Sequence, residues 1–368
     1  MSTVYEKTYN GMTECVENVS IKTRKLEKFE AIHANKILVV GLGQLGLPVA
    51  KYVHERGLDV YGYDVSSKAM EHAEKRGVKK ATNFSGFDVY IICVSTHKQE
   101  DMFSPQIEGL LSIVETISKE AKDGALVSIE STIPLGTSKK VLEMLNHRLH
   151  VVHAPHRWYA LEEQKHGVNQ LRVIGGVRDC CLGVGMQFYD SHRWESDITI
   201  NNEDDGSKDV DTASITTHDP IYSTALMSDT PSTRTLGIPM HSVSSIEIAE
   251  LTKIIENAHR YLQIAFAEDL YLYCQANNLS FSELRNSLNT KWNVNILEPR
   301  EGIGGHCLPK DTKMFLNSST STKSSISSKI IQAAIEVDLD YRKYRQNGQQ
   351  QAIVIEENNK VGMQQFSR

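Results

Sequence analysis

The stretch that decides the fold is Lys36-Ile-Leu-Val-Val-Gly-Leu-Gly-Gln-Leu-Gly46, near the amino end of a chain of 368 residues. Lys36–Val40 predicts a buried strand, and the run from Leu47 to Glu55 predicts a helix directly after the glycines. A Gly-x-Gly-x-x-Gly turn between a strand and a helix is the fingerprint of a dinucleotide-binding unit. We therefore expect an α/β fold that begins with a Rossmann-like domain.

The glycine turn and the acid after the next strand predict the cofactor. Gly41 permits a tight turn, Gly43 lets a pyrophosphate approach the helix, and Gly46 lets helix and strand pack closely. Gln44 and Leu45 complete this predicted cofactor loop. Asp64 ends the next predicted strand, 23 residues after Gly41. A carboxylate there binds a ribose 2′-hydroxyl and repels a 2′-phosphate, so NAD is predicted rather than NADP.

A cysteine in the glycine-rich segment Glu301-Gly-Ile-Gly-Gly-His-Cys-Leu-Pro-Lys-Asp311 is a candidate nucleophile. Glycines adopt positive φ and let a bulky substrate approach the backbone. Lys310 would favour the thiolate of Cys307, and Asp311 would accept a proton. The alternative is an ordinary turn with a half-buried cysteine.

Lys253 and Asn257 lie on a predicted long helix from Val243 to Ala276. Their spacing of four residues puts both side chains on one face, one turn apart. An apolar stripe runs beside them, so they are expected to border a packed surface and not an ordinary solvated one. The residues of this stripe are Leu251, Ile254, Ile255, Ala258 and Leu262.

These three segments, in this order, resemble the UDP-glucose/GDP-mannose dehydrogenase family of nucleotide-sugar 6-dehydrogenases. The resemblance runs from about Lys36 to Asp311 and includes further matching motifs. They are Val94-Ser95-Thr96, Glu130-Ser131-Thr132-Ile-Pro134-Leu-Gly136-Thr137 and Arg172-Val-Ile-Gly175-Gly176.

The resemblance implies a four-electron oxidation of a sugar CH₂OH to a carboxylate. The aldehyde is captured by Cys307 as a thiohemiacetal, a second NAD oxidises it to a thioester, and water releases the acid. Lys253 and Asn257 would stabilise the oxyanion, while Asp311 and Thr132 would position or deprotonate the water. The added cofactor contacts would be Val94, Ser95, Thr96, Ser131 and Thr132.

The implied substrate is a UDP-N-acetylhexosamine such as UDP-ManNAc or UDP-GlcNAc, or UDP-glucose, in cytoplasmic nucleotide-sugar metabolism and polysaccharide biosynthesis. A catalytically weak or inactive NAD-binding relative that partners or regulates a full-length enzyme is the alternative. The presence of Cys307, Lys253, Asn257 and Asp311 together favours the enzyme.

One motif departs from the family at a residue that assists its catalysis. Where relatives carry a glutamate, this chain reads Ala154-Pro155-His156-Arg157. Histidine relays protons near neutral pH, so His156 is included among the candidate catalytic residues.

The chain divides into five expected segments. These are an amino-terminal extension (1–34), the NAD-binding domain (35–194), a polar insertion (195–240), an all-helical dimerisation domain (241–345) and a disordered tail (346–368). Strands are expected near 36–40, 58–63, 87–94, 125–129 and 150–154. Only 57 residues follow Asp311, so this is expected to be a short form without the family's carboxy-terminal UDP-binding domain. We expect a homodimer, because the long helix forms the dimer interface in relatives.

Composition excludes other classes of protein. The chain has 40 basic and 46 acidic residues and a formal charge of −6, which argues against a nucleic-acid partner. The first 35 residues contain no long apolar run, so no signal peptide or membrane anchor is expected. The six cysteines show no paired metal spacing, and His147, His150, His153 and His156 are interpreted as scattered residues; no metal site is predicted.

Overall fold

The computed structural model describes residues 34–97, 104–157, 167–190, 235–305, 307–321 and 328–365. The expected amino-terminal extension, apart from Ala34, lies outside the described residues. The same holds for His306 and for nearly all of the predicted polar insertion, of which residues 235–240 are described.

The described chain contains one sheet of eight strands, in the order β3-β2-β1-β4-β5-β6-β7-β8. Only β6 and β7 pair antiparallel. The strands are β1 (Lys36–Val40), β2 (Asp59–Tyr63), β3 (Lys79–Lys80), β4 (Val89–Ile92), β5 (Leu126–Ile129), β6 (His150–His153), β7 (Arg172–Gly176) and β8 (Met240–Ser242).

The centre of this sheet has the order of a Rossmann fold. Ile37 of β1 lies opposite Val60 of β2 on one side and opposite Val89 of β4 on the other. Strand order therefore reverses between β1 and β4, and ligands of such sheets bind at the carboxyl ends of the strands beside that point. The α/β fold and the Rossmann-like domain predicted from the sequence are confirmed.

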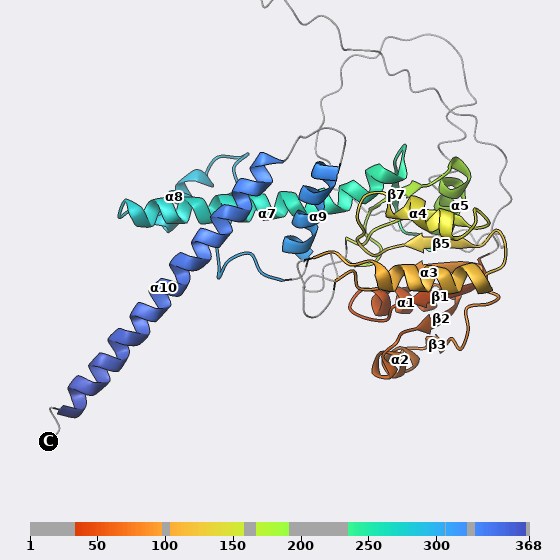
Figure 1. Ribbon diagram of the computed structural model, residues 1–368, viewed down its shortest axis with the longest axis horizontal. Coiled ribbons are helices and arrows are strands. Elements are labelled where there is room, and N and C mark those ends of the chain that lie inside the picture. The colour runs from red at the N-terminus through yellow and green to blue at the C-terminus, as the bar shows by residue number, and fades with distance from the viewer. Residues whose placement is uncertain are drawn as a thin grey trace, which may run out of the picture.

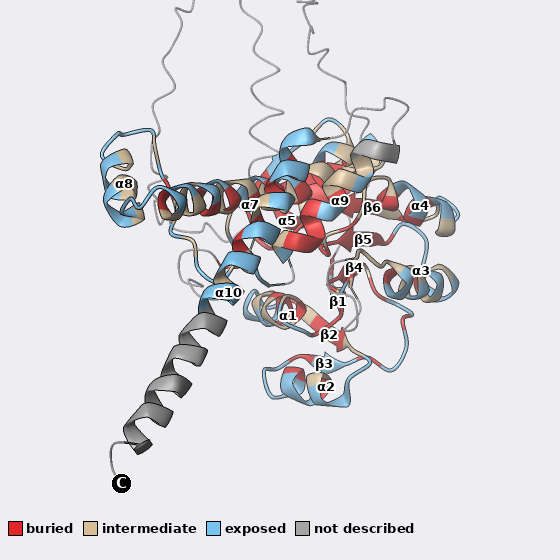
Figure 2. Cartoon of the chain, turned by 60° about the vertical axis from the view of Figure 1, so that its left-hand side comes forward, coloured by how far each residue is buried: buried red, intermediate tan, exposed pale blue. Residues whose placement is uncertain are grey.

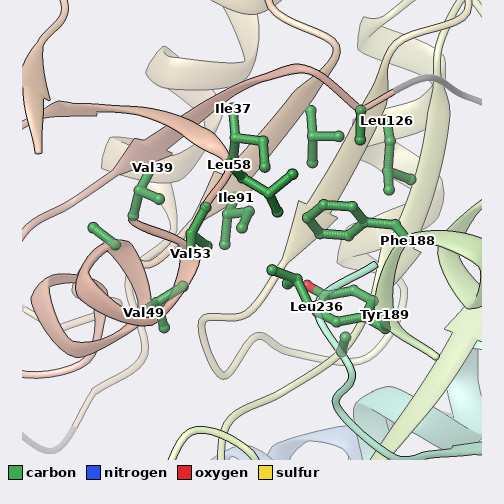
Figure 3. Packing of buried hydrophobic residues seen from close by; sticks show 14 of the residues in the cluster. Ile37, Val39, Val49, Val53, Leu58, Ile91, Leu126, Phe188, Tyr189 and Leu236 are labelled. Carbon is green, nitrogen blue, oxygen red and sulfur yellow. The ribbon is translucent and has the colours of Figure 1, made fainter. Parts of the chain in front are cut away.

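Helices cover both faces because successive side chains of a strand point to opposite sides. Ile37 and Val39 pack in the cluster under α1 (Gly46–Glu55) and α5 (Asp179–Tyr189), part of which Figure 3 shows. Leu38 and Val40 pack in the second cluster, under α3 (Glu108–Glu120) and α4 (Thr137–Met144). The helix α2 (Ser67–Glu74) lies beside β2 and β3 at the edge of the sheet.

A helical region extends away from the sheet on α7 (Ile246–Ala276), as Figure 1 shows. It also contains α8 (Phe281–Leu288), α9 (Cys307–Ser321) and α10 (Lys329–Gln365). Both α9 and α10 pack against α7, and a small core joins Tyr261, Ala265, Ile303 and Ala334. Buried residues recur along the length of α7, whereas α8 contains none (Figure 2). Among the described residues, no helix is both long and apolar enough to cross a membrane.

The structure differs from the sequence expectations in three places. Strands β7 and β8 were not anticipated, and β8 starts inside the predicted insertion and ends inside the segment expected to be all-helical. Cys307 begins helix α9 instead of lying within a turn. Helix α10 continues to Gln365, beyond the helix end expected near residue 345, because its polar second half contains no proline.

Candidate functional site

The turn after β1 leaves no room for side chains at two of its glycines. Gly41 has φ of +88°, and a Cβ there would lie 2.6 Å from the carbonyl oxygen of Cys93. A Cβ on Gly46 would lie 1.7 Å from the carbonyl oxygen of Gly41, so α1 starts directly against the turn. Gly43 has open space where a Cβ would be. This open side is where a phosphate can reach the amino terminus of α1.

Asp64 lies beside the same turn. Its Oδ2 accepts a hydrogen bond from the backbone N–H of Leu42 (2.7 Å), and its Oδ1 accepts one from Ser66 (2.8 Å). A cavity of about 510 Å³ opens here, and Gly41, Gly43 and Asp64 line it. The residues present therefore fit a dinucleotide, with backbone for the pyrophosphate and a carboxylate for a ribose hydroxyl.

The cavity is lined by some of the predicted cofactor residues and by others that were not predicted. Val94 and Ser95 line it, while Gln44, Leu45, Gly46, Thr96, Ser131 and Thr132 lie outside its described lining. Sequence analysis missed the contribution of α3, which supplies Gly109, Ser112, Ile113 and Thr116, and of Phe84 and Val65. The amphipathic pattern of α3 predicts a helix but does not show that its first turns face a ligand.

Cys307 is exposed at the first position of α9, after a loop in which Gly302 and Gly305 have positive φ. Asp311 lies one helical turn further on, so the thiol and the carboxylate share one face of α9. Asp311 itself is 1% exposed.

Two hydrogen bonds connect α9 to the other predicted site residues. The amide of Asn257 on α7 donates to Oδ2 of Asp311 (2.5 Å). Nζ of Lys310 donates to Oγ1 of Thr96 (2.8 Å), and Oγ1 of Thr96 donates to the carbonyl oxygen of Thr132 (2.9 Å). The helical region is thus joined to the carboxyl ends of β4 and β5, where the cofactor cavity lies.

The protein around Cys307 raises the pKa of its thiol. Although the residue is exposed, partial desolvation of its sulfur by the surrounding protein is the largest cause and Asp311 the next, while Lys310 and Lys253 act in the opposite direction. Lys310 does favour the thiolate, as the sequence suggested, but its effect is outweighed. The thiol therefore needs a proton acceptor, and the Asp311 carboxylate is the acidic group that acts on it most strongly.

A second group of buried polar residues is centred on Glu130, which directly follows β5. Nε2 of His156 pairs with Oε2 of Glu130, which Arg172 also contacts through its NH1 (3.1 Å). The hydroxyl of Tyr189 donates to Oε1 of Glu130 (2.5 Å) and lies 2.7 Å from Oγ of Ser128. Burial alone would raise the pKa of Glu130, but Arg172, His156 and Tyr189 outweigh it and lower this pKa to about 2.

His156 is therefore not an open, solvent-facing base. It is 3% exposed, and burial, then Arg172, lowers its pKa despite the opposing effect of Glu130. Lys253 also acts on its charge, which places His156 near the predicted oxyanion-binding lysine. Glu130, Arg172 and Tyr189 are members of this site that sequence reasoning did not single out. Two of them stood in the matched motifs, but nothing in the sequence showed that they meet.

A dinucleotide-binding sheet joined to a helical region that carries a cysteine, a lysine and an amide is the arrangement of a two-part dehydrogenase. Comparison with family models agrees: residues 71–192 match the NAD binding domain of the UDP-glucose/GDP-mannose dehydrogenase family, and residues 247–339 match its central domain. Together the matches span more than half of the chain. The chain belongs to the UDP-glucose/GDP-mannose dehydrogenase family and is an NAD-dependent dehydrogenase.

Several individual relatives share the name UDP-N-acetyl-D-mannosamine dehydrogenase. The chain is 28% identical over 362 aligned residues to a UDP-N-acetyl-D-mannosamine dehydrogenase of Methanococcus maripaludis, covering 92% of this chain and 72% of that protein. It is 26% identical to the enzyme of that name from Campylobacter jejuni, covering 75% of this chain and 66% of that one. A solved UDP-D-ManNAc dehydrogenase from Pyrococcus horikoshii has the same fold, with a TM-score of 0.63 and 24% identity over 88% of this chain and 72% of that one.

Proposed function

We propose that this chain is an NAD-dependent nucleotide-sugar 6-dehydrogenase that uses Cys307 as its nucleophile. The observation that carries the proposal is the pairing of Cys307 with Asp311 on one face of α9, with Asp311 hydrogen bonded to Asn257. Lys310, on the same helix, reaches Thr96 beside the cofactor cavity. A thiol one helical turn from a proton acceptor, on a helix that is hydrogen bonded to a residue beside the dinucleotide cavity, is suited to covalent oxidation of an aldehyde.

The proposed substrate is a UDP-N-acetylhexosamine, with UDP-ManNAc first. Support comes from the relatives named UDP-N-acetyl-D-mannosamine dehydrogenase that the chain resembles over three quarters or more of its length. UDP-GlcNAc and UDP-glucose are the competing substrates. The regulatory alternative gains no support from these comparisons.

Each step of the proposed reaction depends on particular residues of this chain. NAD would be held by Gly41, Gly43 and Asp64 and would supply the oxidant, one molecule of NAD for each of the two hydrides, while the hydroxyl proton lost with each hydride passes to water. Asp311 takes the proton of Cys307 as the sulfur attacks the aldehyde, and Lys253 and Asn257 donate to the oxygen that becomes negative. After the second hydride leaves, the carbon is a thioester on Cys307. Water then breaks its C–S bond, which yields the carboxylate and restores the thiol.

We assign the positioning of His156 to Glu130. The carboxylate holds Nε2 of His156 in place, and Arg172 keeps the same carboxylate ionised. A neutral His156 in this setting can pass a proton during hydrolysis, together with Asp311 and Thr132. The family resemblance implies a carboxylate where this chain has His156. In this chain the carboxylate of Glu130 instead contacts Nε2 of the His156 imidazole.

The proposal extends to a homodimer in the cytoplasm. An exposed apolar stripe on α7 includes Ile248 and Ile255, and a groove on it is lined by these two with Leu251, Thr252, Glu256 and His259. An unpaired apolar helix face suits an isologous contact between two copies. All five described cysteines are free thiols, which fits a reducing compartment.

The test is product analysis with the purified protein, NAD and each of four nucleotide sugars: UDP-ManNAc, UDP-GlcNAc, UDP-glucose and GDP-mannose. We expect two NADH per UDP-ManNAc consumed and no acid from Cys307→Ser. Cys274→Ala, which removes a thiol buried elsewhere on α7, is the matched control and should form acid normally. If the wild type binds NAD yet oxidises none of the four sugars, the regulatory alternative stands in place of the enzyme.

A further inference from the structure

A second group of sulfur and nitrogen atoms lies away from the proposed active site. His150 is the first residue of β6, and Cys180 and Cys181 lie in the first turn of α5. One ligand atom from each of these three residues lies within 4.8 Å of the other two. We call this group the β6–α5 cluster.

The antiparallel strand β7 brings these residues together. Because β7 runs opposite to β6, the chain leaves β7 beside the start of β6 and enters α5 there. The backbone N–H of Val177 donates to the carbonyl oxygen of Val151 (3.1 Å), and the side chain of Arg178 donates to that of Leu149 (3.2 Å). The cluster is therefore held by backbone pairing and packing on both sides.

The spacing is close to that of a tetrahedral metal site. With Zn–S near 2.3 Å and Zn–N near 2.0 Å, neighbouring ligand atoms of a tetrahedron lie about 3.5–3.8 Å apart. Atoms already within 4.8 Å need to approach by at most about 1.3 Å, a shift that side-chain rotation supplies. Cys181 is buried, while His150 and Cys180 are half-buried, so an ion can enter from their side.

The donor set also favours a thiophilic ion. Two thiolates and one imidazole are ligands that zinc and similar metals prefer over magnesium or calcium. The imidazole of His150 is hydrogen bonded to the thiol of Cys181, so these two proposed ligands already face each other. The side chain of Arg178 is hydrogen bonded to Cys181, a contact of the kind that orients thiolate ligands.

The other group of potential ligands in the described chain, Cys93 with Glu130 and His156, differs in one respect. There the guanidinium of Arg172 already pairs with the carboxylate, so the site contains its own cation. In the β6–α5 cluster the neighbouring cation is Arg178, which is hydrogen bonded to Cys181, and the cluster has no carboxylate for it to pair with.

We propose that His150, Cys180 and Cys181 bind a thiophilic divalent metal ion such as Zn²⁺, with water in the fourth position. The site lies at the amino ends of the parallel strands, whereas Gly41 and Thr96 follow carboxyl ends. The ion would tie α5 to β6 and stabilise the sheet without touching cofactor or sugar. The proposal is thus independent of the proposed function.

The experiment is a titration of the reduced full-length protein with Co²⁺, which gives sulfur-to-cobalt charge-transfer and tetrahedral d–d absorption when thiolates bind it. We expect one Co²⁺ per chain, displaced by one Zn²⁺. Removal of an outer partner of a metal ligand weakens binding about 10- to 100-fold, so loss of a ligand in Cys181→Ser should weaken it at least about 100-fold. Cys307→Ser, which removes the exposed thiol on α9, is the control and should bind as the wild type does.

A second variant provides an independent test in case Cys181→Ser does not fold. His150→Asn changes a half-buried residue and should lose both the tight binding and the rise in melting temperature that Zn²⁺ gives the wild type. The proposal fails if no sulfur-to-cobalt band appears at stoichiometric Co²⁺. It also fails if the band survives in His150→Asn and Cys181→Ser but disappears in Cys307→Ser, because the ion would then sit on the nucleophile.

Discussion

Replacing Glu130 with glutamine tests whether the buried cluster is held by charge. Glu130 is 1% exposed and its pKa falls from 4.5 to about 2, mainly through Arg172 and His156 acting against burial. At about 1.4 kcal/mol per unit of pKa, the charged form contributes about 3 kcal/mol to stability. Because the folded-state pKa is the lower one, this stability is present above about pH 4.5 and is lost as the pH falls toward 2.

The substitution also leaves Arg172, which is fully buried, without its carboxylate. Breaking a buried ion pair from one side costs about 3–5 kcal/mol. We therefore expect Glu130→Gln to unfold at about 1–2 M less urea than the wild type at pH 7, given a slope of about 3 kcal/mol per M, the upper end of the usual range, because the slope grows with chain length. Glutamine does not titrate, so the free energy of unfolding of the variant should fall less than that of the wild type as the pH drops from about 4.5 toward 2.

The assay is urea unfolding followed by circular dichroism at several pH values. Glu115→Gln is the matched control, because Glu115 pairs with Lys119 on the exposed surface of α3 and such pairs add little. A midpoint for Glu130→Gln equal to that of Glu115→Gln would refute the reasoning.

Three further outcomes are expected. Asp64→Ala should weaken NAD binding and reduce the preference over NADP, measured by calorimetric titration of both cofactors; an unchanged ratio contradicts the assignment of Asp64. Because burial and Arg172 lower the pKa of His156, turnover should not decline until the pH is below the usual histidine range near 6.5, whereas His156→Ala should show an NADH burst followed by slow release. A normal steady state in that variant would leave hydrolysis to Asp311. Ile255→Asp on the exposed stripe of α7 should yield monomers in sedimentation velocity, and a wild type that is itself monomeric removes the dimer proposal.

The sequence by itself determined the fold class and predicted the main members of the proposed site. The strand, the glycine turn and Asp64 lie within thirty residues, so local patterns were enough to place the cofactor loop. The spacing of Lys253 and Asn257, and of Cys307 and Asp311, is set by one helical turn, which the helices α7 and α9 provide. A helix or turn needs only neighbours in the chain, and these predictions used nothing else.

Only the tertiary structure decided which distant residues meet. Glu130 and His156 follow β5 and β6, and Arg172 begins β7. No sequence pattern predicted that β7 would pair antiparallel with β6. The same reversal brings His150 to the cysteines of α5, although their separation of thirty residues resembles no metal motif. The physical reason is that pairing between strands depends on the packing of the whole sheet. A sequence pattern records which face a residue occupies, but not the partner that the sheet order places opposite it.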